Sequence, residues 1–155
     1  MTAESLIARL DESRNWFLKA LDGLKDGQWD AKPYPNVKSI RETLAHLVID
    51  DRCFPLMLQG KEPDYEALAP DASLSAGDLL ALLERTHREK LDWLRGYLKV
   101  KDLDQEIDTV YSGRQPLWAE VVTIANEDWY HIGQVSLIRQ GLQPDWDYYA
   151  HFYAG

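Results

Sequence analysis

Apolar residues recur with a helical period along most of the chain. Near the start, leucines and a phenylalanine recur at spacings of three, four or seven with charged residues between them, which predicts a helix over about residues 3–26. A second helix is predicted over about residues 40–59. Ser39 and Glu42 have the spacing of a capping box at its start, and Gly60 is typical of its end.

Two further helices are predicted in the second half of the chain. Ser75 suits the cap of a third helix, whose leucine stripe alternates spacings of three and four and includes His87. The irregular piece DTVYSGRQ, with a turn expected at Ser112-Gly113, precedes a fourth helix that begins near Pro116 and is ended by Gly141 and Pro144.

Four helices and no convincing strand pair predict an all-α fold, a four-helix bundle with long inter-helix connections. Each helix has one apolar stripe that only neighbouring helices can cover, so we expect an up-and-down-like arrangement. The polar, proline-broken connection GKEPDYEALAPDAS is expected to cross one end of the bundle. The length of 155 residues and the lack of an internal repeat predict a single domain over residues 1–155.

The charge balance disfavours two classes of partner. With 26 acidic against 17 basic residues and a net charge of -9, the chain is expected to repel a nucleic-acid backbone and an anionic membrane. We therefore expect no nucleic acid and no membrane among its partners. The first residues lack a basic segment followed by an apolar one, and Cys53 is the single cysteine, which together predict a cytoplasmic location.

Two polar residues interrupt the inward stripe of the fourth helix. Glu127 and His131 are four residues apart and fall at core positions among apolar residues. A buried carboxylate needs a partner, and His131 is near enough to be one. In the second helix, His46, Asp50 and Cys53 follow one another at spacings of four and three. Metal sites in bundle cores are built in this way, from ligands on facing helices.

The stretches SIRETLAHLVIDD and LWAEVVTIANEDWYHIGQVSLIRQGLQPDWDYY resemble the DinB/YfiT-like superfamily of four-helix bundles. The resemblance implies a divalent metal held by three histidines, one in the second helix and two in the fourth. His46 matches the first of these positions and His131 the last, whereas the middle position is Glu127. Two imidazoles and one carboxylate can hold zinc, nickel, iron or manganese. The resemblance also implies the alignment of the second helix beside the fourth.

An open metal site of this kind favours hydrolase or transferase chemistry. Together with the resemblance to the superfamily, it implies a metal-dependent hydrolase or a thiol S-transferase that acts on an unknown small molecule or thiol. Asp50 is a candidate to orient His46 or to act as a base. The alternative is a metal-free bundle, in which Glu127 and His131 satisfy each other and the protein binds a small ligand or associates with a partner without turnover. Cys53 is interpreted as a small buried apolar residue, and the spacing assigns no role to Gln134.

The aromatic content and the family resemblance predict a homodimer. The six tryptophans and eight tyrosines are interpreted as mostly core and interface material, since aromatic side chains are common in interfaces. Sedimentation velocity at high micromolar concentration tests this prediction. We expect a dimer, and a monomer at that concentration would contradict it.

Overall fold

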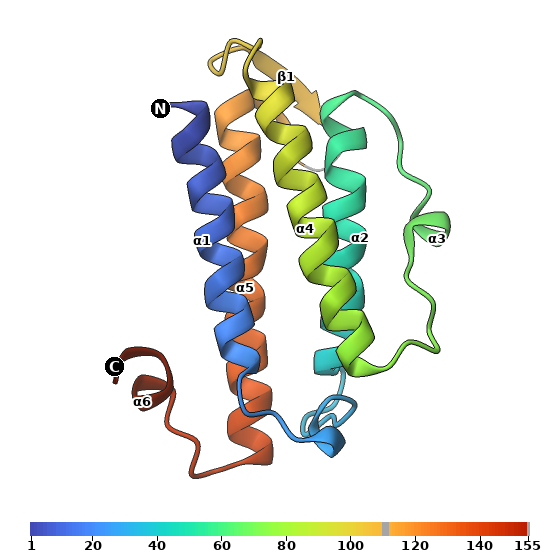
Figure 1. Cartoon of the computed structure of the whole chain (residues 1–155), viewed down its shortest axis with the longest axis vertical. Coiled ribbons are helices and arrows are strands. Elements are labelled where there is room, and N and C mark those ends of the chain that lie inside the picture. Colours follow the sequence, from blue (N-terminus) through green and yellow to red (C-terminus); the bar gives the residue numbers. More distant parts are fainter. Residues whose placement is uncertain (110–111, 155) are drawn as a thin grey trace.

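The computed structural model describes residues 1–109 and 112–154 and consists mainly of four long helices (Figure 1). The four-helix-bundle prediction is confirmed. The long helices are α1 (Ala3–Leu21), α2 (Ile40–Leu58), α4 (Ala76–Leu98) and α5 (Leu117–Leu142). The short ones are the 3-10 helix η1 (Asp26–Gln28), α3 (Tyr65–Leu68) and α6 (Tyr148–Tyr153).

Side-chain caps start α2 and α4 where the sequence predicts. The Ser39 hydroxyl accepts a hydrogen bond from the Glu42 amide at 3.2 Å, and the Glu42 carboxylate accepts one from the Ser39 amide at 2.7 Å. The Ser75 hydroxyl caps α4 by accepting a hydrogen bond from the Asp78 amide at 3.1 Å. Helix α1 ends at Leu21 rather than near residue 26, because Gly23 adopts a φ of 76°, which breaks the helical conformation.

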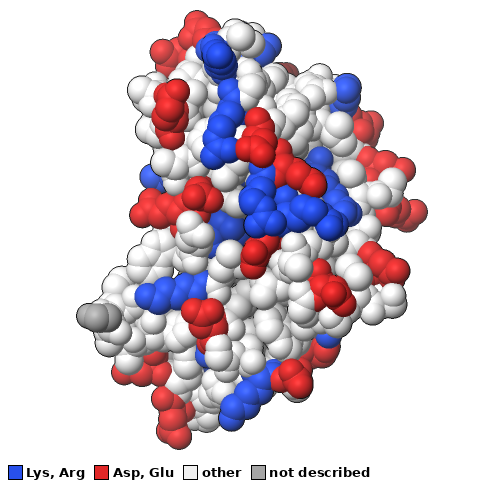
Figure 2. All heavy atoms as spheres, viewed as in Figure 1, with Lys and Arg blue, Asp and Glu red and all other residues white. Residues whose placement is uncertain are grey.

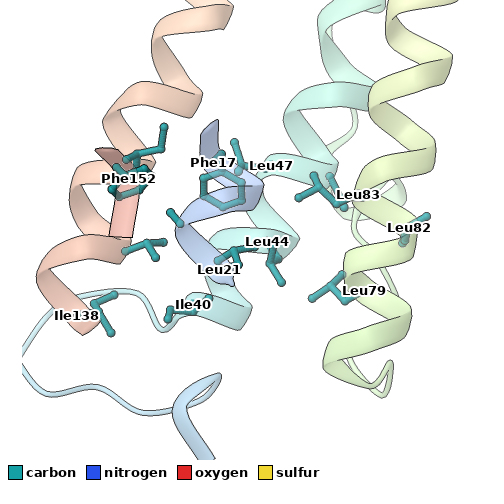
Figure 3. Close-up of a cluster of buried hydrophobic side chains, with 14 residues drawn as sticks. Phe17, Leu21, Ile40, Leu44, Leu47, Leu79, Leu82, Leu83, Ile138 and Phe152 are labelled. Carbon is teal, nitrogen blue, oxygen red and sulfur yellow. The ribbon is translucent and has the colours of Figure 1, made fainter. Parts of the chain in front are cut away.

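The helices do not alternate in direction, so the up-and-down-like expectation is wrong. One hydrophobic cluster joins the ends of α1 and α5 to the starts of α2 and α4 (Figure 3). A second joins the opposite four ends. Helices α2 and α4 therefore run in the same direction, antiparallel to α1 and α5. The connection between Leu58 and Ala76 returns along the length of the bundle and does not merely cross its end (Figure 1).

Helix α1 packs along α5 and α2 packs along α4, while α2 also contacts α5. Helices α1 and α2 thus occupy opposite corners, and the segments before α2 and before α5 cross the two ends of the bundle. This arrangement places α2 beside α5, as the metal-site hypothesis requires.

A short antiparallel hairpin corrects the expectation that the chain has no strand pair. Strand β1 (Glu106–Thr109) pairs with β2 (Gly113–Pro116), with Ile107 opposite Gln115. Each strand has only four residues, too few for a period to be recognised. The turn expected at Ser112-Gly113 joins them, with Gly113 at a φ of 65°, while residues 110 and 111 lie outside the described residues.

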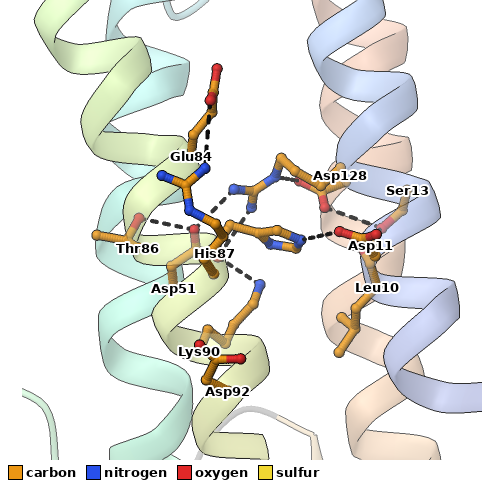
Figure 4. Close-up of polar contacts among 12 residues, drawn as sticks. Leu10, Asp11, Ser13, Asp51, Glu84, Thr86, His87, Lys90, Asp92 and Asp128 are labelled. Atoms are coloured by element: carbon orange, nitrogen blue, oxygen red, sulfur yellow. Dashed lines mark hydrogen bonds and ion pairs between the residues drawn. The ribbon is translucent and has the colours of Figure 1, made fainter. Parts of the chain in front are cut away.

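A buried charged layer crosses the middle of the bundle (Figure 4). The Arg14 guanidinium of α1 donates two hydrogen bonds to Asp51 of α2, at 2.9 and 3.1 Å, and one to Asp128 of α5 at 2.9 Å. The Lys90 ammonium of α4 donates to Asp51 at 2.6 Å. All four residues are at most 3% exposed. Two cations and two carboxylates, one from each long helix, therefore compensate one another away from water.

The outer face formed by α1 and α4 carries both signs of charge. Figure 2 shows several basic side chains gathered near the middle of this face, with acidic side chains between and around them. None of the helices in the described part of the chain has the length and apolar character needed to cross a lipid bilayer.

We predict that Asp51→Asn destabilises the protein by about 3 kcal/mol or more, because it leaves the cations of Arg14 and Lys90 buried without full compensation. Urea denaturation measures the change. The matched control is Asp92→Asn, which breaks an exposed pair with Arg95 and should cost at most about 1 kcal/mol. Equal losses in the two variants would contradict the prediction.

Asp51→Asn should also alter the pH dependence of the unfolding free energy. Burial opposes ionisation of Asp51, but the charges of Lys90 and Arg14 outweigh it and hold the pKa of this carboxyl well below its usual value. Its contribution is thus present above the unfolded pKa of about 4 and is lost as the pH falls toward the folded value. Asp51→Asn should flatten the acid limb of a plot of unfolding free energy against pH, and an unchanged limb would contradict this.

Candidate metal centre

Helices α2 and α5 bring the three predicted ligands together. One candidate ligand atom each from His46, Glu127 and His131 lies within 4.8 Å of the other two. The two imidazole rings meet edge to face, with centroids 5.0 Å apart. This is the only cluster of three or more potential metal-ligating groups in the described part of the chain. The spacing of four in α5 and the adjacency of α2 produce it.

The buried charged layer sets the direction in which this site faces. Successive residues of an α-helix are rotated by about 100°. Asp51 and Asp128 point into the bundle, so their chain neighbours Asp50 and Glu127 point sideways, toward the groove between α2 and α5. The inward ion pairs therefore fix the rotation of both helices that present the metal-site residues.

Glu127 is not a core residue, which corrects the expectation from the apolar stripe. Its side chain is 42% exposed, whereas that of His131 is 3% exposed. The carboxylates that α5 does bury are those of Glu120 and Asp128. The Glu127 Oε2 atom lies 3.8 Å from His131 Nε2, which is too far for a hydrogen bond. The two residues therefore do not satisfy each other, and this weighs against the metal-free alternative.

His131 is oriented for ligation. Its Nδ1 atom donates to the Gln134 side-chain oxygen at 2.7 Å, which places the proton on Nδ1 and leaves a lone pair on Nε2. That Nε2 atom is buried and has no hydrogen-bond partner among the described residues. Burial lowers the pKa of His131, so the ring is neutral near pH 7, as ligation requires. An orphaned imidazole nitrogen that faces two further donor groups fits a metal ion.

Asp50 contacts His46, with its Oδ2 atom 3.3 Å from His46 Nε2. Burial, followed by the nearby positive charge of Lys38, lowers the pKa of His46 to about 4. Burial and the negative charges of Glu127 and Asp51 raise the pKa of Asp50 to about 7. The pair thus combines a neutral imidazole with a carboxyl that can exchange a proton near neutral pH.

Two cavities adjoin the cluster, one on each side of His46 and Glu127. One, of about 300 Å³, opens beside His131 and has Lys38 at its edge. The other, of about 330 Å³, extends along α2 and α5 toward the hairpin and includes Cys53 in its wall. The candidate metal centre therefore has room for a small molecule beside it.

Two other residues considered in the sequence lie outside the cluster. Burial and the charge of Asp50 raise the pKa of Cys53 to about 12, so this thiol is protonated near neutral pH, in agreement with its interpretation as a small buried residue. His87 lies in the opposite half of the bundle, with Nε2 at 3.5 Å from Asp11 (Figure 4). Its pKa is lowered to about 3 by burial and then by the charges of Arg14 and Lys90.

A family model described as the DinB superfamily matches residues 9–135. The chain belongs to the DinB superfamily. This match spans the four long helices up to residue 135 of α5, and it confirms the resemblance seen in the sequence. A comparison with proteins of curated function gives no match.

Two solved structures share this fold. A conserved protein from Enterococcus faecalis is 15% identical, with a TM-score of 0.64 over 94% of this chain and 99% of the other. YfiT from Bacillus subtilis is 18% identical, with a TM-score of 0.63 over 90% of this chain and 87% of the other. YfiT is described as a probable metal-dependent hydrolase with an unusual four-helix bundle topology.

Sequence reasoning missed two features that support the site. Gln134 is three residues from His131, so it lies on the same helix face, but an amide at that spacing has many other uses. The buried ions were also overlooked. Arg14 and Asp51 each continue an apolar stripe in their helices, and a charged residue at such a position was the available signal.

We predict that Gln134→Ala weakens zinc binding about 10- to 100-fold, because the His131 ring loses the acceptor that fixes its tautomer and orientation. Competition with a chromogenic chelator measures the affinity. Gln140→Ala, at an exposed position of the same helix, is the control and should leave the affinity unchanged. If both variants bind zinc like the wild type, the assigned role of Gln134 is wrong.

Proposed function

We propose that this DinB superfamily member is a divalent-metal-dependent enzyme that acts on a small molecule, either as a hydrolase or as a thiol S-transferase. His46, Glu127 and His131 are the proposed ligands. The observation that carries the proposal is the buried Nε2 atom of His131, which has no hydrogen-bond partner among the described residues and faces two other ligand groups. The description of YfiT as a probable metal-dependent hydrolase supports the same class of activity.

The donor set limits the choice of cation. Two neutral imidazoles and one carboxylate suit zinc and iron(II), and they also accept nickel or manganese. A cation bound there supplies Lewis acidity, which activates water or a thiol and polarises a carbonyl. Three protein donors leave coordination positions for a reactant, and the adjoining cavities provide the space for it.

Side chains of the protein orient the ligands, exchange a proton and provide a charge for the substrate. His131 is held by Gln134, while Asp50 contacts His46 and can take up or release a proton at its carboxyl near neutral pH. Cys53 keeps its proton, so an S-transferase reaction would use an external thiol. Lys38, at the edge of the second cavity, provides a positive charge for an anionic group of the substrate.

Substitution of Glu127 tests the metal centre. Glu127→Gln should reduce metal affinity by more than about 100-fold, since it removes an anionic ligand, and should change the unfolding free energy by less than about 0.5 kcal/mol at this half-exposed position. Glu127→His should retain a metal but shift the preference toward softer ions. Elemental analysis after dialysis without chelator, together with urea denaturation, measures both effects.

The wild type and His131→Ala provide the reference points for that experiment. The wild type should hold a stoichiometric metal, and His131→Ala should lose it. A wild type that holds no metal and gains no thermal stability from added zinc, nickel, manganese or iron(II) would contradict the metal centre.

Turnover separates an enzyme from a binding module. Activated esters, and low-molecular-weight thiols paired with an electrophile, should be converted by the metal-loaded wild type. Conversion should fall on chelation and in Asp50→Asn, with metal content retained in that variant. A metal-loaded protein that converts neither class of substrate would instead support ligand binding without turnover.

A further inference from the structure

The cavity on the hairpin side of the metal centre ends at a second carboxyl group. Glu120, in the first turns of α5, lines this cavity although the residue is only 1% exposed. Its Oε2 atom accepts a short hydrogen bond from the side-chain amide of Gln115. This carboxyl group has no part in the ligand cluster or in the charged layer that joins the helices.

Glu120 differs from the other buried acids in the partner that it has. Asp51 and Asp128 both contact the guanidinium of Arg14. For Glu120, no Lys or Arg of the described residues lies within ion-pair distance, and its carboxyl group accepts a hydrogen bond from the neutral amide of Gln115. The start of α5 adds partial positive charge but no full one. A buried carboxylate in such a place is stabilised by a cationic or hydrogen-donating group that enters the cavity.

The spacing along α5 sets a length for such a ligand. Glu120 and Glu127 are seven residues apart, which is two helical turns or about 10 Å along one face. Apolar side chains lie along the wall of the cavity between these two ends, including those of Ile49, Met57 and Ile124. The cavity thus presents a carboxyl group at one end, an apolar middle and the candidate metal centre at the other end.

We propose that this cavity binds a linear amphipathic amine, with the nitrogen at Glu120, the apolar chain along Ile49 and Ile124, and the reacting group near Glu127. The position of the reacting group rests on the proposed function. The amine site itself does not, since Glu120 and Gln115 belong to no ligand set. Glu120 is therefore a specificity-determining residue that selects substrates with a nitrogen about 10 Å from the reacting group.

Three probes with the same chain length test the amine site. Hexylamine, hexan-1-ol and hexanoate are titrated into the full chain by proton–nitrogen NMR, both as purified and after dialysis against EDTA. Hexylamine should bind about tenfold more tightly than hexan-1-ol in both forms, because it makes a charge-assisted hydrogen bond, and hexanoate should bind most weakly. Hexylamine, but not hexan-1-ol, should shift the side-chain amide signal of Gln115.

Two matched variants locate the amine. Glu120→Gln should reduce the preference for hexylamine over hexan-1-ol to less than about twofold. Glu127→Gln, at the other end of the same cavity, should keep the preference. Ile124→Trp should weaken both probes alike, because its ring occupies the middle of the cavity. If Glu120→Gln does not fold, the shift of the Gln115 side-chain amide signal in the wild type shows whether the amine lies at Glu120.

Several results would overturn the amine site. Equal affinities for the three probes, or no binding, would do so. If the preference for hexylamine over hexan-1-ol vanished on metal removal, the amine would be a ligand of the metal. If that preference were lost in Glu127→Gln but kept in Glu120→Gln, the nitrogen would lie at the Glu127 end of the cavity. A wild type that takes up no divalent metal even when zinc, nickel, manganese or iron(II) is added, and that still selects hexylamine through Glu120, would contradict the proposed function and leave the amine site intact.

Discussion

The structure depends on one buried guanidinium. Arg14 donates hydrogen bonds to carboxylates on two other helices. Lys90 of the fourth helix donates to one of these carboxylates, that of Asp51. Removing these ions from water is costly, and their mutual contacts, with hydrogen bonds from the hydroxyls of Thr86 and Ser13, compensate that cost. Because the contacts are directional, they fix how α2 and α5 are rotated about their axes. The chain neighbours of Asp51 and Asp128 then face each other across a groove, and the candidate metal centre is formed there.

The features that the sequence predicted are local ones. Capping residues such as Ser39 and Ser75 and the apolar stripes located the four long helices, because these signals act within one or two turns. The spacing of four also placed Glu127 beside His131. The adjacency of α2 and α5 came from the family resemblance, since periodicity describes a face of a helix and not the helix that covers it. For the same reason, the parallel course of α2 and α4 was not foreseen.

The exposure of Glu127 shows where the apolar stripe misleads. A stripe covers a wide sector of a helix, and a residue at its edge lies in the core or in a groove, depending on how the neighbouring helix approaches. Here the edge opens into cavities, so the carboxylate is accessible to a ligand while His131 stays buried. The two buried acids Asp51 and Glu120 have different surroundings. The charge of Asp51 is compensated by cations and stabilises the fold, whereas Glu120 lies at a cavity and has a neutral hydrogen-bond partner.

The central claim is that two imidazoles and one carboxylate hold a divalent cation between α2 and α5. X-ray absorption spectroscopy of the zinc-loaded chain tests this most directly. We expect nitrogen and oxygen neighbours at about 2.0 Å and the outer-shell scattering of two imidazoles, with one imidazole lost in His46→Ala. A sulfur neighbour at about 2.3 Å, which would place the zinc at Cys53, or a spectrum without imidazole scattering would contradict the account.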